Sequence, residues 1–472
     1  MKGLATSFLL IYVTLLTGQS ILVSEGLDIR SDLSYELLGD FGDKYMVASY
    51  SDDKFTIHNY DTELFLTSEQ EFFLPEKRAR IIHVYPYEDR FSLLYTLPDR
   101  DTIWVVNQSY NSNFDKLKAD TLLQLEKDFR SLSFRYTFSE DKKKLGLTVI
   151  RGEDLIHYMV YDVAYEEIVH ESPLDLGPFA FYDDYRKSVL SNSGILYLIF
   201  EQNNTFRKMD EHAFFIYKIR DANAVEESIL PMKTMLTYDA KFLYDNRNNK
   251  LIICGLGSEE NRDRAEMIFQ VKQDPKDPDY FEFLTFVFHN NLLNDFYGPN
   301  RKARIDYLQN VQIQDVVLLD DGSSVLLLEE VRKLQRVTTG GRIDYYGSRF
   351  TVDYHYENIL LFYLIDSGES WQKLLPKRQF SNDDEGAYSS YFLFKNPNHF
   401  RLIYNDEIRN ENTVSEYIIR PNGSSLRTNL LSTEFQRLRL QVRHGMQLSG
   451  HRLIIPSVRG KEMKLLLIDY LN

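Results

Sequence analysis

Cysteine is nearly missing from this chain of 472 residues, which contains one, Cys254. A chain with a single cysteine forms no internal disulfide, so its fold must be held together by burial alone. Cys254 lies within the apolar run LIICGLG, where we expect it to be a buried small hydrophobic residue.

Positive charge is also scarce, because 55 Lys and Arg residues face 70 Asp and Glu residues, for a formal net charge of -15. This balance argues against a general nucleic-acid binder, which needs a basic face to neutralise phosphates.

Catalytic signatures are lacking as well. The chain has no HExxH, no GxSxG, no phosphate-binding glycine loop and no dinucleotide fingerprint, and its ten histidines show no metal-ligand spacing.

Long apolar runs are absent except at the N-terminus, where residues 4–16 follow the positively charged Lys2. Residues 1–20 therefore predict a secretory signal peptide, with small residues at Gly18 and Ser20 ahead of a cut before Ile21. An uncleaved membrane anchor is the alternative, but polar and small residues interrupt the run at 17–20. We expect a secreted or periplasmic protein without a membrane span after cleavage.

The rest of the chain predicts mainly short strands. Tyr and Phe, which favour strands, are abundant (32 and 31), and apolar runs of 5–8 residues alternate with polar turns. The best amphipathic stretch, residues 115–129, suits a strand as well as a helix. Eight hairpins recur. Their first strands are predicted at 45–50, 90–97, 144–150, 195–200, 250–256, 324–330, 400–404 and 452–458. Their partners are predicted at 55–60, 102–107, 155–163, 213–219, 266–271, 358–365, 413–419 and 464–471.

Most hairpins follow one another after roughly 53 residues, a spacing typical of repeated sheets. The strands are too apolar to stand alone and must pack between neighbours. The pattern predicts an all-β fold, a β-propeller of eight blades with seven as the alternative, closed by an N-terminal strand within 27–40. Residues 21–472 form one domain with insertions at 272–311 and 331–357. A parallel β-helix or tandem sandwiches are the other architectures considered.

The insertion at 331–357 is the predicted recognition loop, because long loops on a rigid scaffold usually carry binding residues. Its candidate ligand-binding residues are Tyr345, Tyr346, Arg349, Tyr354 and Tyr356. A basic strip suits an anionic or glycan ligand through Arg contacts and ring stacking, with ordinary charge balancing as the alternative. The strip consists of Arg301, Arg304, Arg332, Lys333, Arg336, Arg342 and Arg349.

Two turns carry further candidates. Asp366, Gly368 and Trp371 resemble the Asp-box of sialidase-like propellers, although Leu364 stands where that box opens with Ser or Thr. The resemblance implies a structural turn. Asp383 and Asp384 are a candidate calcium site, with a solvated acidic loop as the alternative.

Residues 320–405, from DDGSSVLLLEE through PKRQFSNDDEGAYSSYFLF to FRLIYND, resemble an uncharacterised group of exported bacterial propeller-like proteins. This resemblance implies an envelope or secreted propeller without an assigned activity. We therefore expect a binding or scaffold protein for a protein or glycan partner, with no cofactor. The alternatives are a propeller-type glycoside hydrolase or lyase that uses paired carboxylates, and a subunit of an outer-membrane assembly.

Overall fold

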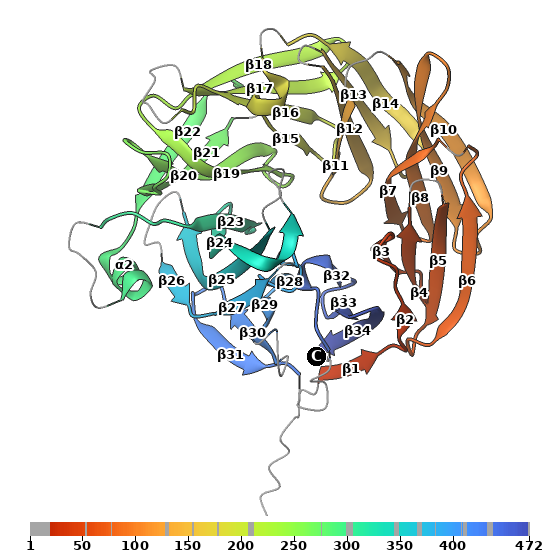
Figure 1. Ribbon diagram of the computed structural model, residues 1–472. Coiled ribbons are helices and arrows are strands. Elements are labelled where there is room, and N and C mark those ends of the chain that lie inside the picture. Colours follow the sequence, from red (N-terminus) through yellow and green to blue (C-terminus); the bar gives the residue numbers. More distant parts are fainter. Residues whose placement is uncertain are drawn as a thin grey trace, which may run out of the picture.

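The computed structural model describes residues 19–470 except for 52–53, 77, 128–131, 153–154, 177–178, 206–211, 275, 299–304, 344–348, 366–370, 383, 407, 409–412 and 432–437. The predicted signal peptide therefore lies almost wholly outside the described residues. Within them, the chain forms eight antiparallel sheets of four or five strands, arranged around a common centre (Figure 1). This is the predicted all-β, propeller-type architecture.

In seven of these sheets the four main strands run outward from the centre in chain order, and in the last sheet the N-terminal strand takes the outermost place. The innermost strands are β3 (Ser34–Asp40), β7 (Arg80–Tyr87), β11 (Leu132–Phe138), β15 (Tyr185–Leu190), β19 (Leu236–Asp245), β23 (Val311–Leu318), β28 (Phe392–Asn396) and β32 (Met446–Gln447). The second strands are β4 (Lys44–Tyr50), β8 (Arg90–Pro98), β12 (Lys144–Arg151), β16 (Leu196–Gln202), β20 (Lys250–Ser258), β24 (Ser324–Ile343), β29 (His399–Asn405) and β33 (Arg452–Arg459).

The third strands are β5 (Lys54–Asp61), β9 (Thr102–Asn111), β13 (Leu155–Asp162), β17 (Ala213–Asp221), β21 (Met267–Gln273), β25 (Arg349–Leu364), β30 (Val414–Ile419) and β34 (Glu462–Tyr470). The outermost strands are β6 (Leu66–Phe73), β10 (Lys116–Glu126), β14 (Glu167–Leu174), β18 (Ala224–Pro231), β22 (Phe281–Val287), β26 (Gln372–Leu375), β31 (Ser425–Asn429) and β1 (Gln19–Val23). The second and third strands coincide with the predicted hairpins, and residues 115–129 contain the strand β10.

The N-terminal strand completes the last sheet, because β1 pairs with β34 from Gln19↔Tyr470 to Val23↔Leu466. The prediction that 27–40 supplies this strand is wrong in detail. Only the short β2 (Leu27–Asp28) pairs with β34, whereas Ser34–Asp40 is the innermost strand of the first sheet. The apolar spacing of 27–40 gave a strand but did not say which sheet it joins.

Eight clusters of buried side chains lie between successive sheets. One of them joins the last sheet to the first through Ile454 and Leu467 on one side and Val47 and Tyr60 on the other. Burial explains the strand pattern: β4, β8 and β12 are buried at nearly every residue because a neighbouring sheet covers each face. Cys254 is fully buried, as predicted, and burial raises the pKa of its thiol to about 11.

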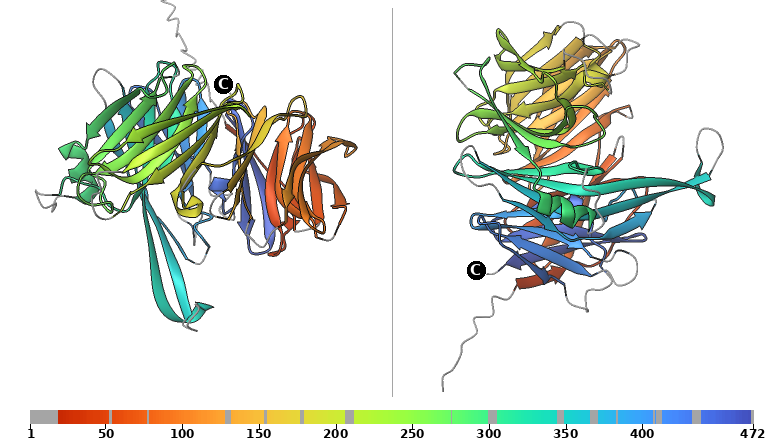
Figure 2. Two further views of the ribbon diagram at one scale, coloured as in Figure 1. Left: turned by 90° about the horizontal axis from the view of Figure 1, so that it is seen from above. Right: turned by 90° about the vertical axis from the view of Figure 1, so that its left-hand side faces the viewer.

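The predicted insertions have different structures. Residues 272–311 contain the end of β21, all of β22 and the helix α2 (Asn290–Tyr297), which lies beside the disc (Figure 1). Residues 331–343 and 349–357 belong to β24 and β25, which continue past their own sheet as a long hairpin that projects out of the disc (Figure 2). The described residues also include the short helices α1 (Phe181–Asp184) and η2 (Val442–His444). Within the described residues, no helix is long and apolar enough to cross a bilayer.

Candidate functional site

Four hollows follow one another around the beginnings of the innermost strands, and we call this opening the axial mouth. Their volumes are about 460, 290, 410 and 540 Å³. Each hollow shares residues with the next: Tyr136 joins the first to the second, Lys187 the second to the third, and Lys241 the third to the fourth. The hollows therefore form a continuous arc of the kind that suits an extended ligand.

The long hairpin projects from the same face as the axial mouth. β24 pairs with β23 as far as Val311↔Glu330, so Glu330 lies level with the beginning of that innermost strand. Beyond Glu330, β24 pairs with β25 alone. A ligand in the axial mouth would therefore lie on the side of the disc from which the hairpin extends.

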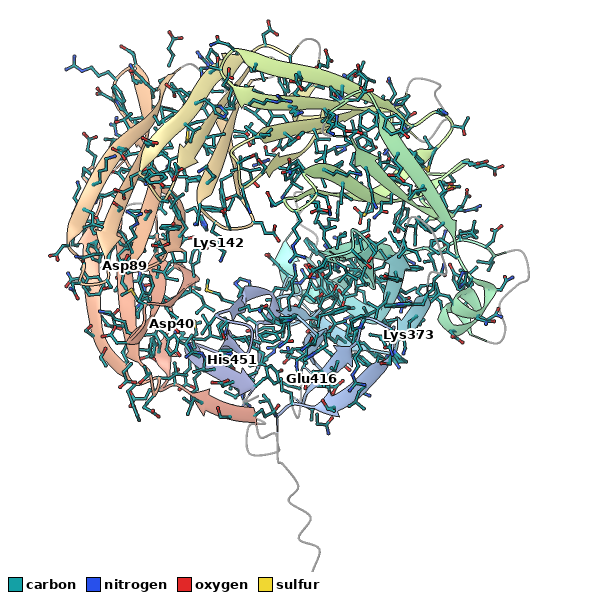
Figure 3. All side chains as sticks on the ribbon, turned by 180° about the vertical axis from the view of Figure 1, so that it is seen from behind. Asp40, Asp89, Lys142, Lys373, Glu416 and His451 are labelled. Carbon is teal, nitrogen blue, oxygen red and sulfur yellow. The ribbon has the colours of Figure 1, made fainter. Side chains whose placement is uncertain are left out.

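A separate hollow of about 810 Å³ opens on the opposite face, where the innermost strands end. Residues such as Glu140, Asn246 and Asn396, in the turns after innermost strands, help to line it. Figure 3 views this face and labels further turn residues, among them Lys142 and His451. Lys187 lines hollows on both faces, which places it within the channel between them.

Four titratable side chains from four different strands meet in the first hollow of the axial mouth: Glu36 on β3, Tyr50 on β4, His83 on β7 and Tyr136 on β11. Nδ1 of His83 lies 3.3 Å from Oε1 of Glu36. The hydroxyl of Tyr50 donates to Oε2 of Glu36 over 3.2 Å. The ring of Tyr136 stacks on the imidazole of His83, with centroids 4.3 Å apart and an angle of 16° between the planes.

The environment of this group keeps its tyrosines protonated. Burial and the Glu36 carboxylate raise the pKa of Tyr50 and of Tyr136. Tyr136 nevertheless retains 42% of its surface exposed, so its ring is open to the hollow. Arg443 and His444 of η2 line the same hollow.

Cationic side chains outnumber acidic ones along the whole arc, although the protein is acidic. The cations that line its first three hollows are Arg135, Arg186, Lys187, Lys241, Arg262 and Arg443, and the acids are Glu36, Glu201 and Asp239. Desolvation lowers the pKa of Lys187, and the neighbouring charge of Lys241 lowers it further. An anion bound between these two like charges would relieve their mutual repulsion and stabilise their charged forms.

The acids of the third hollow are already occupied by internal contacts. Glu201 accepts from Nε of Arg186 at 2.6 Å and lies 2.9 Å from Nε2 of His212. These partners outweigh the effect of burial and lower the pKa of Glu201. Asp239 accepts the backbone amide of Ile313 over 2.7 Å. Neither carboxylate is therefore left to repel an anionic ligand at full strength.

The predicted recognition residues fall in three groups. Tyr345 and Tyr346 lie outside the described residues, and Arg349 is described for its backbone in β25 only. Tyr354 and Tyr356 are 7% and 2% exposed and pack on Val331 in a small core at the base of the hairpin. Because their rings are buried, these two tyrosines brace the hairpin, and the guanidinium of Arg443 covers the ring of Tyr356 at 4.8 Å from its centroid.

The basic strip is in part balanced by acids across the hairpin. Arg332 pairs with Glu357, and Arg336 forms a two-pronged ion pair with Asp353. These partners belong to β25, opposite the arginines of β24. Arg301 and Arg304 lie outside the described residues. Charge balancing, the alternative to ligand binding, therefore accounts for Arg332 and Arg336.

In the predicted Asp-box turn, Asp366 and Gly368 lie outside the described residues. Trp371 stacks on Tyr363, with centroids 5.6 Å apart, and its ring lies against Gly423 of the next sheet. A Cβ at Gly423 would come within 2.8 Å of the indole, so only glycine fits there. These contacts pack Trp371 between two sheets, and the Asp-box turn stays a prediction.

At the calcium candidate, Asp383 lies outside the described residues. Asp384 accepts from Ser381 and from the amide of Gly386, and it pairs with Arg439 at 3.3 Å. The described part of the chain contains no cluster of three His, Cys, Asp or Glu side chains able to hold a metal ion. The contacts of Asp384 are those of a residue that closes a turn.

A buried ion pair that sequence reasoning missed lies beneath the hairpin. Nζ of Lys377 is 2.6 Å from Oε1 of Glu329, and both side chains are fully buried. Ser390 donates to the other carboxylate oxygen over 2.5 Å, and Lys377 also donates to Gln379 over 2.6 Å. Lys377, Gln379 and Ser390 belong to the PKRQ…YSSY segment and Glu329 belongs to β24, so that segment fixes the base of the hairpin.

No protein-family model matches the chain, and no curated protein matches it in sequence. Among solved structures, it is similar to the polysaccharide lyase Uly1, with 12% identity and a TM-score of 0.40 over 82% of this chain and 89% of the lyase. It is also similar to the β-propeller domain of the Trilobed protease from Pyrococcus furiosus, with 10% identity and a TM-score of 0.36 over 85% and 98%. The fold assignment made above rests on the sheet topology.

Proposed function

We propose that this protein is an exported β-propeller of eight blades that binds an acidic polysaccharide at its axial mouth. The observation that carries the proposal is the surplus of cations, interleaved with tyrosines, around this opening of a protein with a net charge of -15. This positive opening attracts anions, whereas the acidic remainder of the protein repels them.

Recognition of an acidic sugar needs two kinds of contact, and the arc supplies both. Guanidinium groups hold carboxylate or sulfate groups through paired hydrogen bonds. Aromatic rings stack on the apolar faces of sugars, and Tyr136 presents an exposed ring for this purpose. The continuity of the four hollows favours a chain of sugars over a single small anion.

Two other functions, a glycoside hydrolase with paired carboxylates and a module that binds a protein partner, have less support. A hydrolase with paired carboxylates needs two acids that face each other across a pocket. In the third hollow, Glu201 and Asp239 are instead held by a salt bridge and by a backbone amide. A protein partner would require an exposed recognition surface, and the predicted candidates Tyr345, Tyr346 and Arg349 lie outside the side chains that the structure describes.

The test is titration calorimetry with polygalacturonate, alginate and chondroitin sulfate as acidic chains and dextran as the neutral control. The double variant Lys187→Ala/Lys241→Ala removes two cations of the arc, whereas Lys373→Ala removes one from the outermost strand β26. At about 0.7 kcal/mol for each exposed pair, we expect the double variant to bind roughly tenfold more weakly and the control to bind normally. Binding should weaken as salt is added. Equal binding of dextran, or no loss in the double variant, contradicts the proposal.

Export is part of the proposal and has its own test. A cut before Ile21 leaves Ile21–Val23 of β1 to pair with β34. N-terminal sequencing of the protein recovered from its native cells should therefore begin at Ile21. A protein that retains Met1 and fractionates with membranes would support the anchor alternative.

A further inference from the structure

We propose that the axial mouth is also catalytic, with His83 as the general base of a polysaccharide lyase and Glu36 as the residue that positions it. The inference rests on the proposed function, because it requires a uronic acid chain in the same opening. It deepens that function by naming a reaction, β-elimination next to the uronate carboxylate.

The contact with Glu36 favours one form of the imidazole. Nδ1 of His83 lies 3.3 Å from Oε1 of Glu36, so the carboxylate favours a neutral imidazole with its proton on Nδ1. In that form Nε2 carries the lone pair. The described residues offer no hydrogen-bond partner for Nε2, and His83 lines the 460 Å³ hollow. This is the arrangement of a base held in one orientation by a carboxylate.

His83 differs from two other histidines that contact carboxylates, because in those two both ring nitrogens have a partner. Nε2 of His58 lies 2.8 Å from the hydroxyl of Ser49 while its Nδ1 meets a glutamate. Nδ1 of His212 lies 2.6 Å from the carbonyl oxygen of Met235 while its Nε2 meets Glu201. In both cases each ring nitrogen has a partner, and neither histidine lines one of the hollows of the axial mouth.

The reaction balances without a metal, oxidant or second substrate. Nε2 of His83 takes the proton from C5 of a uronate, the electron pair of that C–H bond forms a C4=C5 double bond, and the C4–O4 bond breaks. The departing O4 takes a proton and becomes the new chain end. One polysaccharide chain gives two, and the new non-reducing end is an unsaturated uronate.

Neighbouring groups have the chemistry that the remaining steps need. Arg443 lines the same hollow and can neutralise the uronate carboxylate, which makes the adjacent C5 proton more acidic. Tyr136 stacks on His83, and its raised pKa keeps the hydroxyl protonated, so it can supply the proton that O4 takes. Base, acid and carboxylate binder thus come from three separate elements around one hollow.

The experiment follows ultraviolet absorbance, because the C4=C5 bond conjugated to the carboxylate absorbs and the intact chain does not. The mature protein is incubated with polygalacturonate, alginate and chondroitin sulfate, and binding is measured in parallel by calorimetry. We expect the native protein to produce absorbance from one of these chains. His83→Ala should lower the rate about 100-fold or more while binding persists. His451→Ala, in a turn on the opposite face, is the matched control and should keep the native rate.

Glu36→Gln tests positioning. It should lower kcat about tenfold and leave KM near the native value, because a misplaced imidazole weakens proton abstraction and not sugar binding. Glu36→Asp, which keeps the carboxylate, should restore part of kcat, whereas a merely structural Glu36 would change kcat and KM together.

Each of the other experimental outcomes overturns a particular part of the proposal. Binding without unsaturated product overturns the lyase and leaves the binding proposal intact. Chain cleavage without absorbance means hydrolysis, and product formation that survives His83→Ala means a different base, so both overturn the assignment. Absence of binding to every acidic chain overturns the proposed function, and the lyase with it.

Discussion

The buried pair of Lys377 and Glu329 gives the sharpest test of how the hairpin is anchored. Lys377→Met removes the ammonium and leaves the Glu329 carboxylate buried, with Ser390 as its remaining close donor. Removing one partner of a buried pair costs about 3–5 kcal/mol. With an unfolding entropy of about 2.1 cal/mol/K per residue, a chain of 472 residues should lose roughly 3–5 °C of Tm.

The assay is thermal unfolding followed by circular dichroism, with two comparison variants. Lys373→Met removes a lysine that donates to the carbonyl of Gly423 over 3.0 Å from a partly buried position, so it should cost about 1 °C. The double variant Glu329→Leu/Lys377→Met replaces both charges by apolar groups and should recover most of the loss. A native Tm in Lys377→Met, or a double variant that is as unstable as the sum of its single changes, would refute the reasoning.

Two further predictions concern stability. Gly255→Ala places a Cβ 2.1 Å from Cζ of the fully buried Phe269, so it should destabilise the protein by about 1–3 kcal/mol in denaturant titrations, whereas Gly450→Ala, with open space around it, should be neutral. Burial raises the pKa of Asp162, but its bonds with Lys144 and with backbone amides outweigh burial and lower the pKa overall. The stabilisation is therefore complete above about pH 3.9 and is lost as the pH falls through the folded-state pKa, so Asp162→Asn should be less stable than the native protein at neutral pH, and the difference should disappear in acid. A constant difference across the acid range would show that the ionised carboxylate is not the cause.

Much of the fold could be predicted because its most buried strands have the plainest signal. The second and third strands, such as Leu196–Gln202 and Ala213–Asp221, are apolar along their whole length since a sheet covers each face. Most of the innermost strands are not indicated by the sequence. β15, with the sequence YRKSVL, carries Arg186 and Lys187 because it borders the channel, and such strands look like loops.

The candidate site could not be predicted, because its members share no spacing. Glu36, Tyr50, His83, Tyr136 and Arg443 meet only after the last sheet packs against the first. The sequence prediction instead placed the binding site in the insertion 331–357, because tyrosines cluster there along the chain. Two of those tyrosines, Tyr354 and Tyr356, turn out to be core residues, since alternating side chains of a strand face opposite ways and one face of the hairpin base is covered.

The most direct test of the account is a crystal structure of the protein with a short uronic acid oligosaccharide. We predict sugar density in the axial mouth, with carboxylates on Lys187, Lys241 or Arg443 and a ring on Tyr136. Density confined to the opposite opening, or to the outer strands, would contradict the assignment of the binding site.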